Sequence, residues 1–151
     1  MKYFFKPDFF VLLISILVMA AVGMLISIIH WNSIASFFFL AFMIGIIIYG
    51  LAVVPLWTEV NEKYIKVKQV VGCKKFAKDK VKLSPITKDD LKGAIRVFGS
   101  GGYGGYTGWF RNKTLGKFFM LILNKKELAL IETEKGRRFV INYPHQLFEN
   151  H

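Results

Sequence analysis

The sequence predicts an α+β membrane protein, in which an N-terminal two-helix transmembrane hairpin precedes a mainly antiparallel β domain with a short C-terminal helix. Two observations predict this fold class. Two near-continuous apolar runs occupy most of the first 57 residues, and each is long enough to form a membrane-spanning helix. After them, apolar and polar residues alternate in the period-2 pattern of half-buried strands. We therefore divide the chain into a hairpin, residues 1–57, and a β domain, residues 58–151.

The apolar runs cover residues 9–29 and 34–57, and neither contains Asp, Glu, Lys or Arg. About 20 residues of α-helix cross roughly 30 Å of hydrocarbon, and in lipid a helix satisfies its own backbone hydrogen bonds. Since only residues 30–33 connect the runs, the two helices are expected to lie antiparallel. Trp31 and Trp57 lie towards the ends of the second run, where amphipathic rings prefer the membrane interface.

The basic residues are distributed asymmetrically around the two runs. The chain has 21 Lys and Arg and a net charge of +11. Lys2 and Lys6 precede the first run, none lies between the runs, and the others follow the second. The positive-inside rule then predicts a multi-pass protein with both termini in the cytoplasm. The single cysteine, Cys73, cannot form an internal disulfide and suits a reducing compartment.

The apolar runs carry no charged residue that could mark an ion path, a proton relay or a substrate site. We therefore interpret the hairpin as an anchor or a docking surface rather than a transporter. Small residues at four-residue spacing allow close helix packing, although Gly and Ala are also common in membrane helices without that role. These residues are Gly23, Ser27, Ala41 and Gly45.

The β domain begins with two lysine-rich strands. Residues 64–70 alternate as a half-buried strand, with Ile65 and Val67 on one face, and residues 76–83 predict the next strand. Lysines occupy alternate positions on the other face of each strand. We predict that they contact anionic lipid headgroups, where each Lys contributes about 1 kcal/mol; an ordinary solvated face is the alternative. This predicted anionic-lipid face consists of Lys66, Lys68, Lys78, Lys80 and Lys82.

The rest of the domain contains further strands and two short helical segments. Thr87 is placed to cap a helical turn, with Asp90 in the reciprocal capping position. Pro144 is placed to open a C-terminal helix over residues 145–150. Three strands lie between these segments, and we predict that they form a meander: residues 117–123, 128–133 and 137–142.

Residues 96–110 are rich in glycine and aromatic residues. They contain G-x-G-x-x-G, but the segments that follow favour strands rather than the helix a dinucleotide site needs. Two interpretations remain. The glycines could permit positive φ and a bulged strand connection covered by aromatics, or a flexible tip could bind a partner, the membrane interface or an anion. The predicted interaction loop consists of Arg96, Gly99, Gly101, Tyr103, Gly104, Tyr106, Trp109 and Arg111.

Several stretches of the β domain resemble the bacterial pleckstrin-homology-like (PH-like) domains of membrane-attached proteins. The resemblance covers roughly residues 58–150 and implies two nearly orthogonal antiparallel sheets, closed at one end by a C-terminal helix. It also implies a bacterial cytoplasmic (inner) membrane, and it implies no family-wide catalytic residue. The stretches that carry it are R-V-F-G-S-G at 96–101, G-W-F at 108–110, the strand at 118–123, I-E-T at 131–133 and G-R-R-F-V-I at 136–141.

We expect a membrane-anchored, non-enzymatic binding or scaffolding module with no catalytic, cofactor-binding or metal-binding residues. The three histidines lie apart along the chain, so they suggest no metal triad or catalytic dyad. The expected partners are the lipid bilayer, anionic lipid headgroups, and another membrane protein or a second copy of the chain. We do not expect nucleic acid, since the bilayer supplies a nearer anionic surface. The alternative function is an accessory subunit that docks through its helix hairpin on a larger membrane complex.

Overall fold

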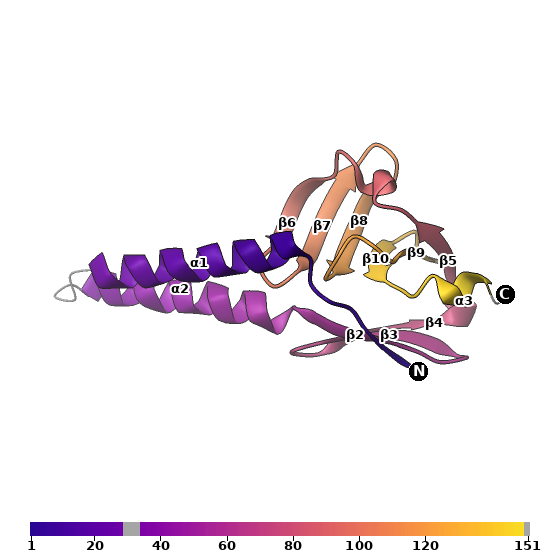
Figure 1. The fold of residues 1–151 in the computed structure, drawn as a ribbon, viewed down its shortest axis with the longest axis horizontal. Coiled ribbons are helices and arrows are strands. Elements are labelled where there is room, and N and C mark those ends of the chain that lie inside the picture. Colours follow the sequence, from indigo (N-terminus) through magenta and orange to yellow (C-terminus); the bar gives the residue numbers. More distant parts are fainter. Residues whose placement is uncertain (29–33, 150–151) are drawn as a thin grey trace.

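The computed structural model describes residues 1–28 and 34–149. Two helices, α1 (Phe9–Ile28) and α2 (Ile34–Ala52), lie side by side and project away from a β domain, and both chain ends lie at the β-domain end (Figure 1). Both helices are long and apolar enough to cross a membrane, and 11% and 6% of their apolar windows are buried within the protein. Such exposed apolar helices differ from the core helix of a soluble protein, which is mostly buried. The predicted turn at residues 30–33, including Trp31, lies outside the described residues.

The second helix is shorter than the predicted span. α2 ends at Ala52, and the next strand, β2 (Pro55–Val60), contains Trp57. Pro55 cannot continue a helix because its ring removes the backbone N–H and clashes with the preceding turn. Trp57 therefore packs in the sheet against Phe4, with ring centroids 5.7 Å apart and the rings tilted by 43°, instead of ending a membrane helix.

The N-terminal residues also belong to the β domain, which the division at residue 57 did not foresee. β1 (Lys2–Phe4) pairs antiparallel with β2, and the Met1 ammonium donates a 2.7 Å hydrogen bond to the Val60 carbonyl. A strand of three residues has too little pattern to be recognised in a sequence.

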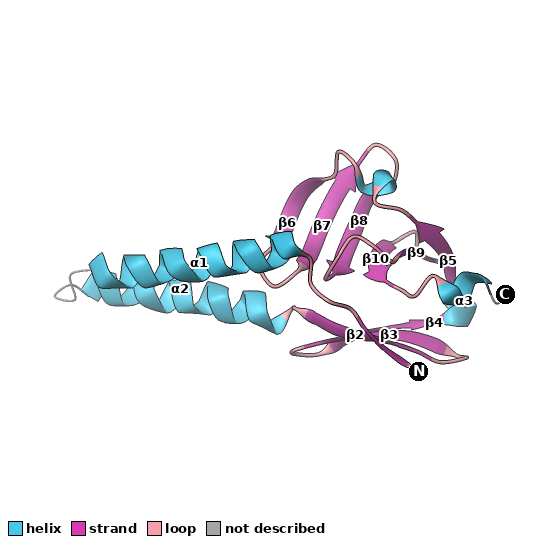
Figure 2. Cartoon of the chain, in the orientation of Figure 1, coloured by secondary structure: helices cyan, strands magenta, loops and turns pink. Residues whose placement is uncertain are grey.

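The domain contains two sheets whose strands run in different directions (Figures 1 and 2). The smaller sheet has the order β1-β2-β3-β4 and adds β3 (Tyr64–Gln69) and β4 (Cys73–Ala77). The larger sheet has the order β5-β9-β10-β8-β7-β6. Its strands are β5 (Val81–Ile86), β6 (Ile95–Gly101), β7 (Tyr106–Asn112), β8 (Gly116–Ile122), β9 (Leu128–Thr133) and β10 (Arg138–Asn142).

The predicted meander is wrong in its pairing. β10 lies between β8 and β9, antiparallel to β9 and parallel to β8. The buried Asn142, at the end of β10, is hydrogen-bonded to the β8–β9 connection, which passes over it. Its Oδ1 accepts a 2.7 Å hydrogen bond from the Leu123 N–H, and its Nδ2 donates to the carbonyls of Asn124 and Glu127. The connection between β8 and β9, which a meander would require to be a hairpin turn, therefore crosses over the end of β10.

The strand predicted over residues 76–83 is interrupted. β4 ends at Ala77, a single 3-10 turn η1 (Lys78–Lys80) follows, and β5 starts at Val81 in the other sheet. The chain therefore changes sheets within the predicted strand.

Other local predictions are confirmed. In β3, Ile65 and Val67 are buried, while Lys66 and Lys68, which alternate with them, face outward. The Asp90 carboxylate accepts hydrogen bonds from the N–H and the hydroxyl of Thr87, at 2.8 and 2.9 Å, beside the short turn η2 (Asp89–Leu91). The C-terminal helix α3 comprises only Gln146–Glu149.

The larger sheet is buried on both faces, which gives the domain two apolar clusters. One lies between the sheets, where Ile65, Val67 and Phe76 meet Leu121 and Ile131. α3 packs against this cluster through Leu147 and Phe148. The second cluster covers the opposite face of the larger sheet and includes Val11 of α1. The first turns of α1 are therefore part of the packing of the β domain.

Candidate functional site

The glycine-rich segment forms the β6–β7 hairpin, and its glycines are required by close backbone packing. Gly99 and Gly108 lie opposite each other with φ of 116° and 147°. A Cβ on Gly99 would collide with the Thr107 carbonyl oxygen, and one on Gly108 would collide with the Phe98 carbonyl oxygen. The structural interpretation therefore holds for this pair. Gly101 has no positive φ, so the expectation of a left-handed backbone does not extend to it.

The turn of this hairpin, residues 102–105, lies against both helices, and we call this contact the helix joint. The Gly104 N–H donates a 3.0 Å hydrogen bond to the hydroxyl of Ser15 in α1. The Ser15 hydroxyl in turn donates to the Val11 carbonyl at 2.7 Å. The Tyr103 hydroxyl reaches the sulfur of Met19 at 3.8 Å.

Glycines on both sides make this close approach possible. A Cβ on Gly50 of α2 would lie 2.6 Å from Cε1 of the Tyr103 ring, and a Cβ on Gly102 would lie 2.8 Å from Cδ1 of Ile14. By contrast, a Cβ on Gly23 or Gly45 would meet no atom within 4 Å, so these two predicted packing glycines do not line a tight contact. Gly50 carried no such prediction, because its partner is more than fifty residues away in the sequence.

The predicted interaction loop does not form one flexible tip. Tyr106 is 5% exposed and belongs to the apolar cluster beneath α1. Trp109 packs edge-on against Phe119 with ring centroids 5.3 Å apart. Tyr103 lies in the helix joint.

The two flanking arginines do not bracket an anion site either. Ile95 lies opposite Arg111, and Arg96 lies opposite Phe110. Since side chains of adjacent residues in a strand point to opposite faces, the two guanidinium groups lie on opposite faces of the sheet.

The outer strand of the hairpin is exposed. β6 is an edge strand of the larger sheet, and its register is shifted by a bulge between Arg96 and Phe98. Its apolar side chains Ile95, Val97 and Phe98 are 73%, 58% and 67% exposed. A strand edge that is both unpaired and apolar is a surface on which another chain can add a strand.

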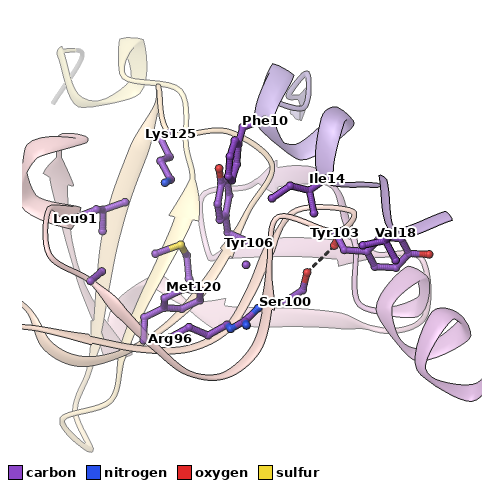
Figure 3. A pocket seen from close by; sticks show the side chains of 13 residues that line it. Phe10, Ile14, Val18, Leu91, Arg96, Ser100, Tyr103, Tyr106, Met120 and Lys125 are labelled. Carbon is purple, nitrogen blue, oxygen red and sulfur yellow. Dashed lines mark hydrogen bonds between the residues drawn. The ribbon is translucent and has the colours of Figure 1, made fainter. Parts of the chain in front are cut away.

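A cavity of about 600 Å³ lies between α1 and the larger sheet, next to the helix joint (Figure 3). Apolar side chains make up most of its lining, and Arg96 and Lys125 are its two cations. The Lys125 ammonium lies 4.3 Å from the centre of the Tyr106 ring. Burial lowers the pKa of Lys125 below its usual value, although the nearby Asp8 carboxylate acts in the opposite direction. Burial, with a smaller effect of Asp8, raises the pKa of Tyr106.

The predicted anionic-lipid face is divided by the fold. Lys66 and Lys68 lie on the outer side of the smaller sheet, whereas Lys82 lies in the larger one. Lys78 follows β4, and its N–H donates to the Lys63 carbonyl in the turn after β2, at the end of that strand away from α2. Lys80 and Lys82 share a surface hollow with acidic side chains, namely Asp79, Glu132 and Glu134. The five lysines are therefore distributed over both sheets and the turn between them.

Within residues 1–28 and 34–149, no group of three or more His, Cys, Asp or Glu side chains is placed to hold a metal ion. The expectation that the chain has no catalytic, cofactor-binding or metal-binding residues stays a prediction.

The two sheets, the short C-terminal helix and the apolar helical pair define a PH-like β domain attached to a helix hairpin. The family model for the bacterial PH domain matches residues 57–144, which is more than half of the chain. The chain therefore belongs to the bacterial PH domain family, as the resemblance implied. No curated protein and no solved structure matches it.

Proposed function

We propose that the chain is a membrane-anchored, non-enzymatic binding or scaffolding module of a bacterial cytoplasmic membrane. In this proposal α1 and α2 cross the bilayer, and the PH domain is held at the cytoplasmic surface. The helix joint supports a fixed orientation of the domain, because Gly104 and Tyr103 contact both helices directly. A domain on a flexible tether would need no such contact.

The observation that carries the proposal is the free apolar edge of β6. Phe98 is 67% exposed and Val97 58%, on a strand that has no neighbour on its outer side among residues 1–28 and 34–149. Large exposed apolar side chains on a strand edge cost solubility and mark interaction sites. We assign this edge to an extended segment of a membrane-protein partner, which would pair with the β6 backbone and cover the side chains.

The test is recovery of partners from native membranes with Phe98→Ser and a matched control. Phe4→Ser is the control, since Phe4 is 72% exposed on the edge strand of the other sheet. The full chain carries an affinity tag, the membranes are cross-linked and solubilised, and recovered proteins are quantified by mass spectrometry. We expect a stoichiometric partner with the unchanged chain and with Phe4→Ser, and at least about a fivefold loss with Phe98→Ser, the loss of about 1 kcal/mol of binding energy.

Three outcomes would count against the proposal. Recovery of no stoichiometric partner would contradict a binding module. Equal recovery with both variants would exclude the β6 edge, and a loss caused instead by Phe42→Ser on the exposed side of α2 would favour an accessory subunit that docks through its helices.

The cytoplasmic orientation is a separate proposal, supported by the charge asymmetry of the sequence. A cysteine at Lys135, which is exposed in the β domain, should resist a membrane-impermeant thiol reagent added to intact cells. A cysteine at Ser33 should react with it. The reverse pattern would place the β domain outside.

A further inference from the structure

The cavity beneath α1 is an extension of an apolar cluster rather than an isolated surface hollow. Leu91, Phe110 and Met120 line it and also belong to the cluster that covers this face of the larger sheet. Tyr106 belongs to both as well. The interior of the cavity is therefore suited to an apolar group. Its volume of about 600 Å³ is within the usual range for small-molecule sites.

One wall of the cavity is a face of the candidate membrane helix. Phe10, Ile14 and Val18 line it, and their four-residue spacing places them on one side of α1. Phe10 is 52% exposed, and only Val11 and Val22 of α1 are buried. The same helix therefore faces the cavity on one side and carries an exposed apolar surface around most of its circumference.

The polar part of the lining is cationic. Arg96 and Lys125 have no carboxylate within ion-pair distance in the described residues. Asp8 lies beside Lys125, and its carboxylate accepts a 3.0 Å hydrogen bond from the Lys125 backbone N–H. Lys88 and Lys126 line the adjoining hollow with Asp8, so cations outnumber the carboxylate around this opening.

We propose that this cavity binds an anionic glycerophospholipid, with its headgroup between the Arg96 and Lys125 side chains and an acyl chain against the α1 wall (Figure 3). The inference rests on the proposed function, because it takes α1 to lie in the bilayer that supplies the lipid. An amphiphile satisfies both halves of the lining, whereas a soluble phosphate would leave the apolar half uncovered. Lys125 has a pKa lowered by burial, so an anion beside it would stabilise its charged form.

The test measures lipid retained by the full chain. The protein is reconstituted in nanodiscs of phosphatidylcholine with a minor fraction of phosphatidylglycerol, released, and examined by native mass spectrometry. Arg96→Gln/Lys125→Gln removes both cavity cations. The matched control, Arg111→Gln/Lys113→Gln, removes two exposed cations that line a different hollow. We expect bound phosphatidylglycerol with the unchanged chain and the control, and about a thirtyfold loss with the first variant, from two cations that each attract an anionic headgroup.

Several results would overturn the proposal. These are equal losses in both double variants, equal retention of phosphatidylcholine and phosphatidylglycerol, or no retained phospholipid. Retention of a free fatty acid or an acylated peptide in place of phosphatidylglycerol would show that the cavity takes a different amphiphile.

A second variant tests the apolar half and guards against misfolding of the first. Ala94 is half-buried in the lining, and Ala94→Phe would fill the cavity while keeping both cations. We expect it to exclude phosphatidylglycerol at an unchanged melting temperature; full retention would overturn the proposal. Failure of the lipid site is distinguishable from failure of the proposed function. If the chain retains no lipid but still recovers a partner through β6, only the proposal of a lipid site is wrong.

Discussion

The two ends of the β6–β7 hairpin both carry aromatic residues, but they differ in glycine content and in surroundings. At the turn, residues 102–105 are packed between α1 and α2, and glycines remove the side chains that would keep the backbones apart. At the other end, Ile95 and Phe98 extend into solvent from an edge strand. Aromatic content alone therefore does not distinguish a structural joint from an exposed surface. The distinction depends on what lies opposite each residue.

In the proposed function the hairpin has two roles. Its turn packs the domain against the helices, and its outer strand would bind a partner. A partner bound at β6 would thus be held in a fixed position relative to the helix pair.

The largest expected effect contrasts an aromatic residue at each end. Tyr106→Ala should destabilise the protein by about 3–5 kcal/mol, because it empties a buried site beside α1. Phe98→Ala should change stability by less than about 0.5 kcal/mol, since that ring is exposed. Thermal melts of the detergent-solubilised full chain measure both. Similar melting temperatures for the two variants would remove the difference between the ends.

A smaller effect is expected at the helix joint, where two glycines of α2 form a matched pair. Gly50→Val should cost about 1–3 kcal/mol, because its side chain would enter the space of the Tyr103 ring. Gly45→Val introduces the same side chain where no atom lies within 4 Å, and it should be close to neutral. The melts are compared in the same detergent. An equal loss of stability in the two variants would mean that valine destabilises the helix itself at either position, and that the helix joint does not cause the effect.

Lys125 provides a prediction that separates stability from binding. Burial lowers its pKa, which means that the folded state disfavours the ammonium relative to the unfolded chain. Lys125→Met should therefore leave the free energy of unfolding unchanged or raise it by less than about 1 kcal/mol, which a thermal melt would detect. Retention of phosphatidylglycerol should fall. A loss of stability together with unchanged lipid retention would assign Lys125 a purely structural role.

The smallest expected effect lies at the turn between β5 and β6. Hydrogen bonds from the Thr87 N–H, and then from its hydroxyl, lower the pKa of Asp90 below 3.8. The unfolded chain binds the proton more readily, so this stabilisation is present above that value and is lost as the pH falls through the folded pKa. Asp90→Asn should lower the melting temperature slightly at neutral pH, and the difference from the unchanged chain should vanish in acid. A difference independent of pH would exclude the charge as its cause.

Local patterns predicted much of this fold. The apolar runs predicted α1 and α2, alternation predicted β3, and the Thr87–Asp90 pair predicted η2. These features depend on residues within a few positions of one another. Periodicity and capping are therefore enough to predict them.

The features that were missed depend on partners distant in the sequence. The insertion of β10 beside β8 depends on hydrogen bonds made by Asn142 across the β8–β9 connection. The helix joint depends on Gly50 meeting Tyr103, and the cavity depends on α1 covering one face of the larger sheet. Arg96 was a predicted site residue, but Lys125 was not, because nothing near it in the sequence indicates that it faces α1.

The most direct test of the account is whether the hairpin turn lies on α2. In a Cys73→Ser background, Gly50→Cys/Tyr103→Cys introduces two cysteines where a Cβ on residue 50 would lie 2.7 Å from Cδ1 of the present tyrosine ring. This contact places residue 50 within one side chain's reach of residue 103. The matched pair Gly45→Cys/Tyr103→Cys moves one cysteine further from the β domain along the same helix. On mild oxidation in native membranes, we expect an intrachain disulfide, detected by peptide mass mapping, in the first pair only. Absence of the bond in the first pair, or equal formation in both, would contradict the helix joint.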